Sequence, residues 1–270
     1  MSACLIDGVA DDGIAVDDRG LAYGHGLFET LEIAAGALPH WERHWRRLCL
    51  GCSRLGLAEP DEALVRGEAE RLAAGLERAV LKLMLTAGSG GVGYRVPDGA
   101  PPRRILSVRD WPERTVPPEG VALRLCRTRL PFDPQLAGIK HLNRLHSVLA
   151  RAEWRDEYAE GLLCDPEGCI VEGTMSNVFW VEGDTLLTPD LSRCGVAGIM
   201  RERIFDWAKD HGVAVRTEAC PPERLRRADA VFVCNSLIGV WPVARLDDHS
   251  LSRSSAVLDG VLAAVRMGNC

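Results

Sequence analysis

The chain has 270 residues, of which 47% are hydrophobic and 26% charged, and its formal net charge at pH 7 is -6. These values are ordinary for a globular protein of one large domain or two small ones, and they exclude a mainly disordered, collagen-like or coiled-coil chain. The acidic balance does not favour nucleic acid or an acidic membrane as partner. No apolar run approaches the ~20 residues of a membrane span, and the N-terminus lacks a signal-peptide pattern. We therefore expect a cytoplasmic protein with free thiols.

The first half of the chain is predicted to form strands, then helices, then strands again. Short apolar runs with period-two alternation, which is typical of strands, lie between turn residues such as the Asp-Gly pairs. Helical spacing of apolar residues separates these runs. Strands are predicted over 5–6, 13–16, 27–33, 79–86, 104–108 and 121–127, and helices over 40–55 and 61–74.

The second half alternates more finely and follows a stretch of turn residues, Leu130–Pro134, that indicates a linker. The predicted helices cover 143–154, 198–211 and 254–266, and the predicted strands cover 160–164, 170–172, 177–181, 185–187, 213–217, 230–234 and 240–245. The chain is thus predicted to be an α+β protein with an N-terminal α+β domain (1–128), a linker (129–137) and a C-terminal domain (138–270).

A glycine-rich stretch, Gly88–Gly93, fits the pattern GxGxxG and follows a predicted strand. Binding of a dinucleotide would require these glycines to open a helix whose N-terminus holds the pyrophosphate. The proline-rich segment 97–102 that follows does not allow such a helix. We therefore expect either a mobile loop near a site or a plain connection, with nucleotide binding as a remote alternative.

Cys49 and Cys52 form a lone Cys-x-x-Cys motif, with no second pair and no histidine at zinc-finger spacing. We predict that both lie inside a helix, and we expect no metal site.

Lysine is scarce: the chain has only Lys82, Lys140 and Lys209, and its other basic residues of this kind are arginines. Arginine stays protonated and cannot act as a nucleophilic amine, so these three residues are the candidates for amine chemistry. Alternation places Lys82 opposite its leucine neighbours, facing solvent, and Lys209 lies near a predicted helix end, where a surface cation is favoured. Lys140 has apolar neighbours that predict partial burial and a lowered pKa, so it is either a structural lysine or a Schiff-base lysine.

Glu172 ends a predicted strand and is followed by hydroxyl and amide side chains, which is typical of a site or of a simple turn. Paired with Lys140, it would suit a pyridine cofactor that needs an amine for its aldehyde and an anion for its ring nitrogen. The phosphate of such a cofactor needs an arginine and a helix N-terminus. Arg47 and the helix start at 198–200 could supply these, although Arg47 alone could equally lie on an exposed helix face.

Six segments, in this order along the chain, resemble the fold-type IV pyridoxal-phosphate enzymes, also called the class IV aminotransferase family. They are 23–30 (YGHGLFET), 44–48 (HWRRL), 138–145 (GIKHLNRL), 172–177 (EGTMSN), 198–201 (GIMR) and 234–237 (CNSL). The resemblance implies a smaller N-terminal α/β domain and a larger C-terminal, cofactor-binding domain with a β-barrel-like sheet and flanking helices. It also implies pyridoxal 5'-phosphate as cofactor and a homodimer.

Within this family, segments 136–145 and 88–94 make the chain most similar to the aminodeoxychorismate lyases. Branched-chain aminotransferases usually carry Gly and then Arg after Phe-Glu, where this chain has Thr30 and Leu31. The resemblance therefore implies conversion of 4-amino-4-deoxychorismate to 4-aminobenzoate and pyruvate, a step of folate biosynthesis. The alternatives are an aminotransferase acting on D-amino acids or branched-chain amino acids, and a binding protein without cofactor.

The same resemblance implies roles for individual residues. Lys140 would form the Schiff base and, once the substrate amine releases it, remove a proton before enolpyruvate is eliminated. Glu172 would pair with the pyridine nitrogen. Thr30 would help to place the acid or the water that protonates the leaving group. The remaining implied cofactor contacts are Arg47, Asn177, the backbone amides of Ile199 and Met200, Asn235 and Ser236.

Met200 stands where aminotransferases commonly have a hydroxyl residue, so only its backbone amide could contribute. The implied substrate contacts are Tyr94, Arg95, Arg144 and His25, of which His25, with Tyr23, would reach the neighbouring subunit's site.

Overall fold

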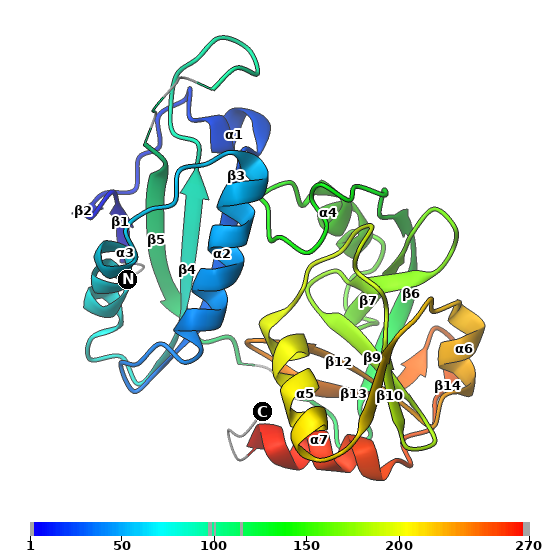
Figure 1. Ribbon diagram of the computed structural model, residues 1–270. Helices are drawn as coiled ribbons and strands as arrows, with labels where there is room; N and C mark the ends of the chain where they lie inside the picture. Colours follow the sequence, from blue (N-terminus) through cyan, green and yellow to red (C-terminus); the bar gives the residue numbers. More distant parts are fainter. Residues whose placement is uncertain (1–2, 97–98, 100, 114–115, 267–270) are drawn as a thin grey trace. The chain divides into compact units, whose positions relative to one another are not determined.

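The computed structural model describes residues 3–96, 99, 101–113 and 116–266. The chain folds into two compact units (Figure 1). Unit 1 comprises Met1–Glu113 together with Ile139–Asn143, and unit 2 comprises Arg114–Gly138 and Arg144–Cys270. The predicted boundary at 128 and linker at 129–137 differ from this division. The segment 121–129 pairs with strands of unit 2, and the chain returns to unit 1 for the five residues after Gly138.

Unit 1 contains a five-stranded antiparallel sheet in the order β2-β1-β5-β4-β3. Its strands are β1 (Cys4–Ile6), β2 (Val9–Ala10), β3 (Gly26–Ala34), β4 (Arg78–Thr86) and β5 (Arg103–Asp110). The helices α2 (Trp41–Leu55) and α3 (Glu62–Ala73) pack against one face of this sheet. Leu31, Leu81 and Leu106 on that face are fully buried. The period-two alternation of β3 and β4 thus separates a core face from a half-buried face, as predicted.

The start of unit 1 differs from the prediction. The strand expected over 13–16 is wrong, because the chain turns earlier, at Asp7 (φ 51°) and Gly8 (φ 84°), and β2 pairs directly with β1. Two residues with positive φ form the tight connection that a two-residue hairpin needs. A short helix, α1 (Arg19–Tyr23), was not predicted, and the Asp18 side chain caps it by accepting a hydrogen bond from the Gly20 amide.

Unit 2 is built on a curled nine-stranded mixed sheet with main order β11-β10-β9-β12-β13-β6-β7-β8, β14 pairing with β13. The strands and helices that the sequence predicted there are present, with small shifts at their ends, so the predicted fold class is confirmed. Two short elements, α6 and β14, were not predicted. The strands are β6 (Val121–Arg129), β7 (Glu160–Cys164), β8 (Ile170–Gly173), β9 (Asn177–Glu182), β10 (Thr185–Thr188), β11 (Ala214–Thr217), β12 (Ala230–Asn235), β13 (Gly239–Leu246) and β14 (His249–Ser250).

Four helices belong to unit 2: α4 (Leu145–Arg151), α5 (Ile199–Asp210), α6 (Pro222–Arg227) and α7 (Ala256–Arg266). One face of the sheet packs against α5 and α7 around Phe179 and Phe232, whose rings stack at 5.1 Å between centroids. A second core lies on the other face, and it includes Trp180 of β9 and Leu225 of α6. Strands β9 and β12 are therefore buried on both faces, which explains their nearly continuous apolar sequences.

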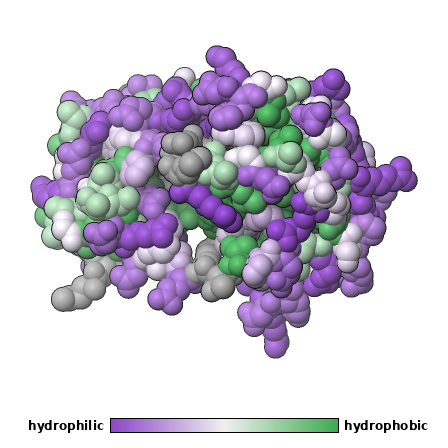
Figure 2. Space-filling view, turned by 90° about the horizontal axis from the view of Figure 1, so that it is seen from below, coloured by the Kyte–Doolittle hydropathy of each residue, from purple (hydrophilic) through white to green (hydrophobic). Residues whose placement is uncertain are grey.

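No helix in the described ranges is both long and apolar enough to cross a membrane. Figure 2 shows one face of the molecule, on which hydrophilic residues predominate and hydrophobic residues gather in smaller patches.

The segment Ile139–Asn143 lies beside the start of β3 in unit 1. The Phe28 amide donates to the Lys140 carbonyl (2.9 Å), and the Leu142 amide donates to the Gly26 carbonyl (2.9 Å). Gly26 makes this approach possible, since a Cβ at this position would overlap the Leu85 carbonyl oxygen and lie 2.7 Å from Leu142 Cδ1. The backbone of Lys140 is therefore fixed by hydrogen bonds to β3.

We expect Gly26→Ala to lower the free energy of unfolding by about 1–3 kcal/mol, because a backbone carbonyl cannot yield to the added methyl group. Gly67→Ala is the matched control: its Cβ would meet nothing within 4 Å on an exposed position of α3. This control should stabilise the protein by about 1 kcal/mol through helix propensity. Urea unfolding of both variants tests the pair, and equal effects would contradict the packing argument.

Candidate active site

Lys140 projects from the segment that lies beside β3. Its side chain is half-buried, as predicted from its apolar neighbours, and its Nζ lies 4.4 Å from the centroid of the Phe28 ring. The adjacent Ile139 is fully buried. The amine is therefore partly shielded from water and lies beside an aromatic face, which attracts a cation.

Thr30 and Lys82 share a face of the unit 1 sheet with Phe28. Thr30 is directly opposite Lys82 in the β3–β4 register, and residues in register point to the same face. The Lys82 Nζ is 5.4 Å from the Phe28 ring centroid. Lys82 points away from the leucine core as predicted but is half-buried, and burial and then the nearby Arg109 lower its pKa. Two amines thus flank one ring beside the Thr30 hydroxyl.

Arg47 lies on α2 and is buried, with its side chain 9% exposed, so the alternative of an exposed helix face is wrong. Its Nε donates to Glu29 Oε1 (2.8 Å) and its Nη2 to Glu29 Oε2 (2.5 Å). This is a side-on, bidentate ion pair between α2 and β3, the geometry in which arginine binds carboxylates most specifically.

Glu29 and His44 are site residues that the sequence interpretation did not identify. His44 Nδ1 lies 2.6 Å from Glu29 Oε2 and donates to it, since an ionised carboxylate only accepts. Burial alone would raise the pKa of Glu29, but Arg47 and the hydrogen bonds from Arg47 and His44 lower it to about 2. The available signal was a charged residue in the core-facing phase of β3, between Leu27 and Leu31.

Glu172 lies one residue before the end of β8 and is buried. Its Oε2 accepts a hydrogen bond from the Val196 amide (2.7 Å). Asn177 holds the same turn from β9: its Nδ2 donates to the Val196 carbonyl (2.8 Å), and its Oδ1 accepts from the Gly198 amide (3.1 Å). The Asn177 side chain, predicted to bind the cofactor, thus bonds the backbone of the turn before α5.

Helix α5 begins immediately after this turn. Its N-cap is Gly198, which offers no side-chain cap. A Cβ there would overlap Asn177 Oδ1, so glycine is required by close packing. The side chains of Ile199 and Met200 are buried at 3% exposure. Only their backbone N–H groups are therefore suited to an anion, as the sequence indicated for Met200.

Asn235 organises the turn after β12. Its Oδ1 accepts from the Leu237 (2.8 Å) and Ile238 (2.9 Å) amides, and its Nδ2 donates to the Met175 carbonyl (2.9 Å). The side chain thus shapes the turn in which Ser236 lies half-buried. The predicted contact of Asn235 with the cofactor stays a prediction.

Glu160, also missed in the sequence, fixes the loop that follows Glu172. Its buried carboxylate accepts hydrogen bonds from the backbone N–H groups of Gly161, Thr174 and Met175, and from the hydroxyls of Thr174 and Ser176. A carboxylate with five donors is fully compensated for its lost hydration.

The glycine-rich loop is attached to α1. The Arg19 guanidinium donates to the carbonyls of Gly90, Gly93 and Tyr94, and the Arg19 amide donates to the Gly88 carbonyl (2.8 Å). Tyr94 is 87% exposed. Residues 94–96 are not helical and the next regular element is β5, so in the described part of the chain no helix begins at these glycines and the GxGxxG pattern does not form a dinucleotide-binding turn.

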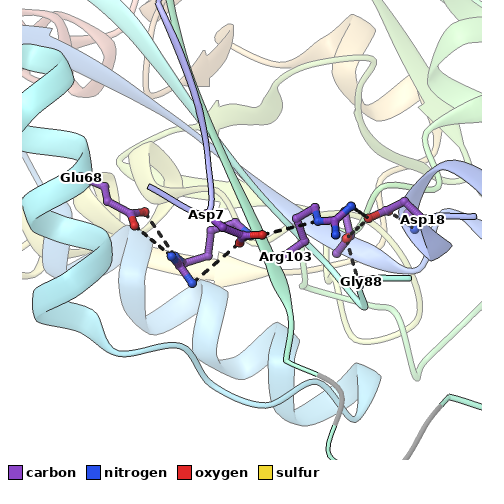
Figure 3. Close-up of polar contacts among 8 residues, drawn as sticks. Asp7, Asp18, Glu68, Gly88 and Arg103 are labelled. Carbon is purple, nitrogen blue, oxygen red and sulfur yellow. Dashed lines mark hydrogen bonds and ion pairs between the residues drawn. The ribbon is translucent and has the colours of Figure 1, made fainter. Parts of the chain in front are cut away.

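A chain of ion pairs supports the base of this loop (Figure 3). Arg103 contacts both Asp7 and Asp18 (3.5 Å each), and Asp18 Oδ2 accepts from the Thr86 hydroxyl (2.9 Å), which in turn accepts from the Gly88 amide (3.1 Å). The loop therefore begins from a well-anchored point although its tip is exposed.

The other predicted substrate contacts belong to several elements of the two units. The His25 ring lies 3.1 Å from the Leu55 carbonyl at the end of α2, and Tyr23 packs edge-on against Tyr94 at 5.5 Å. Arg95 is exposed on the loop, and Arg144 is the N-cap of α4 in unit 2.

Cys49 and Cys52 lie inside α2, as predicted. Burial, the main cause, raises the pKa of the Cys49 thiol to about 11 and that of Cys52 to about 12, so both are poor nucleophiles. Within the described ranges no three histidine, cysteine or acidic side chains are grouped to hold a metal ion.

The lowered pKa of Glu29 predicts acid sensitivity. A carboxyl whose pKa falls on folding stabilises the protein above its ordinary pKa of about 4.3, and this contribution is lost as the pH falls towards about 2. It amounts to on the order of 3 kcal/mol. In Glu29→Gln, the free energy of unfolding should be lower at pH 7 and should vary less between about pH 5 and pH 2. Glu153, whose pKa is also lowered to about 2, leaves a residual slope in both proteins. Parallel curves would contradict the expectation.

Known proteins match the whole chain. The family model "Amino-transferase class IV" matches residues 26–246. An aminodeoxychorismate lyase of Vibrio harveyi is 34% identical over 88% of this chain and 89% of its own length. A crystal structure of 4-amino-4-deoxychorismate lyase from Pseudomonas aeruginosa has a TM-score of 0.93 and 44% identity, covering 99% of this chain and 100% of that one. A PLP-bound hypothetical aminotransferase from Mycobacterium tuberculosis has the same fold, with a TM-score of 0.82 and 23% identity over the full length of both chains. The chain belongs to the class IV aminotransferase family.

Proposed function

We propose that this protein is a pyridoxal-phosphate-dependent lyase that converts 4-amino-4-deoxychorismate to 4-aminobenzoate and pyruvate. Two relatives that match nearly the whole chain are named as such lyases. The observation on the site that carries this choice is the pair Thr30 and Leu31. Thr30 lies on the half-buried face with the Lys140 and Lys82 amines at one ring, whereas Leu31 is fully buried in the core. The position at which branched-chain aminotransferases usually have arginine therefore offers no group for a substrate carboxylate.

The donor groups fit the cofactor. The family depends on pyridoxal 5'-phosphate, and the chain supplies a half-buried amine, a buried carboxylate, a fixed guanidinium and an uncapped helix N-terminus. We assign Lys140 to the aldehyde, Glu172 to the pyridine nitrogen, and Arg47 with the backbone amides of Ile199 and Met200 to the phosphate. Asn177, Asn235 and Ser236 shape the turns that present these groups. When bound, the cofactor withdraws electrons from the carbon atom that carries the substrate amine.

Lys140 performs the proton transfer in this proposal. The amine of Lys140 would accept the proton from the ring carbon that carries the substrate amine. The electron pair left behind returns as the C–O bond to the enolpyruvyl group breaks, the ring becomes aromatic, and protonation of the departing enolpyruvate gives pyruvate. This amine is suited to the step because its backbone is held by a hydrogen bond to β3 and its side chain is partly shielded from water.

Thr30 is assigned to the leaving group. Its hydroxyl lies on the same face as Phe28 and can orient the acid or the water that protonates the departing oxygen. We assign the substrate carboxylates to Arg95 and Arg144, with Tyr94 and His25 as further contacts, since guanidinium groups bind carboxylates bidentately.

We further propose a cytoplasmic homodimer. On α4, Leu145, Val148 and Leu149 are 66%, 60% and 52% exposed, and Met175 is 39% exposed. Val148 and Met175 also line a hollow of about 660 Å³ in unit 2. An apolar stripe beside a hollow is typical of a surface that another protein covers, and we assign a second copy of this chain to it. The nine cysteines in the described part of the chain are free thiols, which suits a reducing compartment.

The lyase assignment predicts that the purified protein with 4-amino-4-deoxychorismate releases pyruvate, measured with a coupled dehydrogenase assay. Lys140→Ala should lose the yellow colour of the bound cofactor and lower turnover by several orders of magnitude, because the proton acceptor is gone. Lys209→Ala, an exposed lysine in the last turn of α5, is the control and should behave like the unaltered protein. Absence of pyruvate, together with amino-group exchange between a D- or branched-chain amino acid and a 2-oxo acid, would establish the aminotransferase alternative instead.

The dimer assignment predicts that Val148→Asp, which places a charge in the apolar stripe of α4, halves the mass measured by light scattering after size-exclusion chromatography. Leu64→Asp is the control, since Leu64 is similarly exposed (50%) but lies on α3 in unit 1. A dimer that survives Val148→Asp unchanged would show that this stripe is not the interface.

A further inference from the structure

We propose that Glu29 and His44 are positioning residues that fix the direction in which the Arg47 guanidinium presents its other N–H groups to the cofactor phosphate. This inference rests on the role assigned to Arg47 in the proposed function. It concerns how the arginine is prepared for the phosphate before any ligand arrives.

The first step is the geometry of the ion pair. A guanidinium has five N–H donors in one plane, and Glu29 accepts two of them, through Nε and Nη2. Because the fork is rigid and planar, these two hydrogen bonds set the plane and rotation of the whole group. The N–H groups on the Nη1 side then point away from Glu29. A lysine, or an arginine held by one hydrogen bond, would have no such defined direction.

The second step is the anchoring of Glu29 itself. Its side chain is 1% exposed on the core face of β3, where water cannot replace a missing partner. His44 Nδ1 donates to the same Oε2 atom that accepts from Arg47 Nη2, at 2.6 and 2.5 Å. His44 and Arg47 are three residues apart on α2 and therefore project from one side of the helix. Two donors from one helix thus hold one carboxylate from the neighbouring strand.

This arrangement of charged groups has a cost in folding free energy. Burying three ionisable groups in a core is unfavourable unless all are paired, and a hydrophobic cluster of similar volume would often be at least as stable. The geometry therefore points to a use in binding. Fixing the arginine beforehand removes the entropy loss of ordering a long side chain when the phosphate binds.

The experiment compares two probes, pyridoxal 5'-phosphate and pyridoxal, which lacks the phosphate, in absorbance titrations of the cofactor-free full chain. Glu29→Gln keeps the size of the side chain but removes the charge and replaces one acceptor oxygen with an NH2 donor, so the bidentate pair with Arg47 Nε and Nη2 can no longer form. We expect the affinity for pyridoxal 5'-phosphate to fall about tenfold, as for the loss of a hydrogen bond to a charged group. The affinity for pyridoxal should stay unchanged.

Glu68→Gln is the matched control. Glu68 is also a buried glutamate of unit 1 in a bidentate pair, accepting from Arg104 Nε (3.2 Å) and Nη2 (2.9 Å) (Figure 3). It should lose stability in the same way without changing the preference for the phosphorylated probe.

Two further variants keep the test decisive if Glu29→Gln does not fold. His44→Leu removes the second donor and should weaken binding of pyridoxal 5'-phosphate about threefold, whereas His44→Asn restores a donor near Nδ1 and should recover most of it. The ³¹P resonance of the bound phosphate should shift in His44→Leu and stay in place in Glu68→Gln, because only the former changes the groups around the phosphate.

Two outcomes would overturn the inference: equal loss of affinity for both probes in the Glu29 and His44 variants, or no loss for either probe. Arg47→Met separates this failure from that of the proposed function. If Arg47→Met keeps the preference for the phosphorylated probe, the assignment of Arg47 to the phosphate is wrong. If it abolishes the preference while Glu29→Gln and His44→Leu leave the preference unchanged, only the positioning role fails. Lyase turnover enters none of these measurements.

Discussion

A carboxylate that is buried away from water must accept hydrogen bonds from donors of the protein. Three buried glutamates have this requirement in the parts of the chain assigned to the site. Glu29 of β3 accepts hydrogen bonds from Arg47 and His44 of α2. Glu172 accepts a hydrogen bond from the Val196 amide in the turn before α5, and Glu160 accepts hydrogen bonds from the loop 174–176. In each case the cost of burial is offset only if a neighbouring segment takes up one particular geometry. These carboxylates therefore define the positions of a helix, a turn and a loop more sharply than apolar packing alone would.

This requirement also explains which aspects of the site were visible in the sequence. Lys140, Glu172 and Arg47 belong to short segments whose order resembles the family, so their identities could be predicted. The supporting residues could not, because their partners are distant in sequence: Glu160 acts on a loop fourteen residues away. Asn177 and Asn235 show the converse. Their segments suggested a cofactor contact, but amide side chains also bond backbone groups nearby, and in the structure they do so.

The fold shows the same division. Strong alternation in β3 and β4 and helical spacing in α2 and α5 predicted those elements well, because each buries a continuous apolar face. Short elements such as α1 and α6 bury few side chains and depend on a cap or a proline at their start, so their apolar pattern is too weak to be read. Two units were predicted, but with boundaries that differ from those of the structure. The return of Ile139–Asn143 to β3 depends on backbone hydrogen bonds and on a glycine where the strands approach closely, and neither feature has a hydrophobic period.

The pairing of Arg47 with Glu29 has a consequence for how an anion is held. A guanidinium already neutralised by a buried carboxylate contributes no net charge with that partner, so it attracts a phosphate through the direction of its N–H dipoles more than through long-range Coulomb energy. In the proposed site the helix N-terminus at Ile199 and Met200 acts in the same way, as a fixed set of N–H groups carrying a fractional charge. Both depend on groups held in place before binding, and such short-range interactions inside a protein are screened by salt far less than exposed ion pairs are. The phosphate would then be selected mainly by geometry, and the rigidity of the Glu29 pair would contribute to binding as directly as the arginine itself.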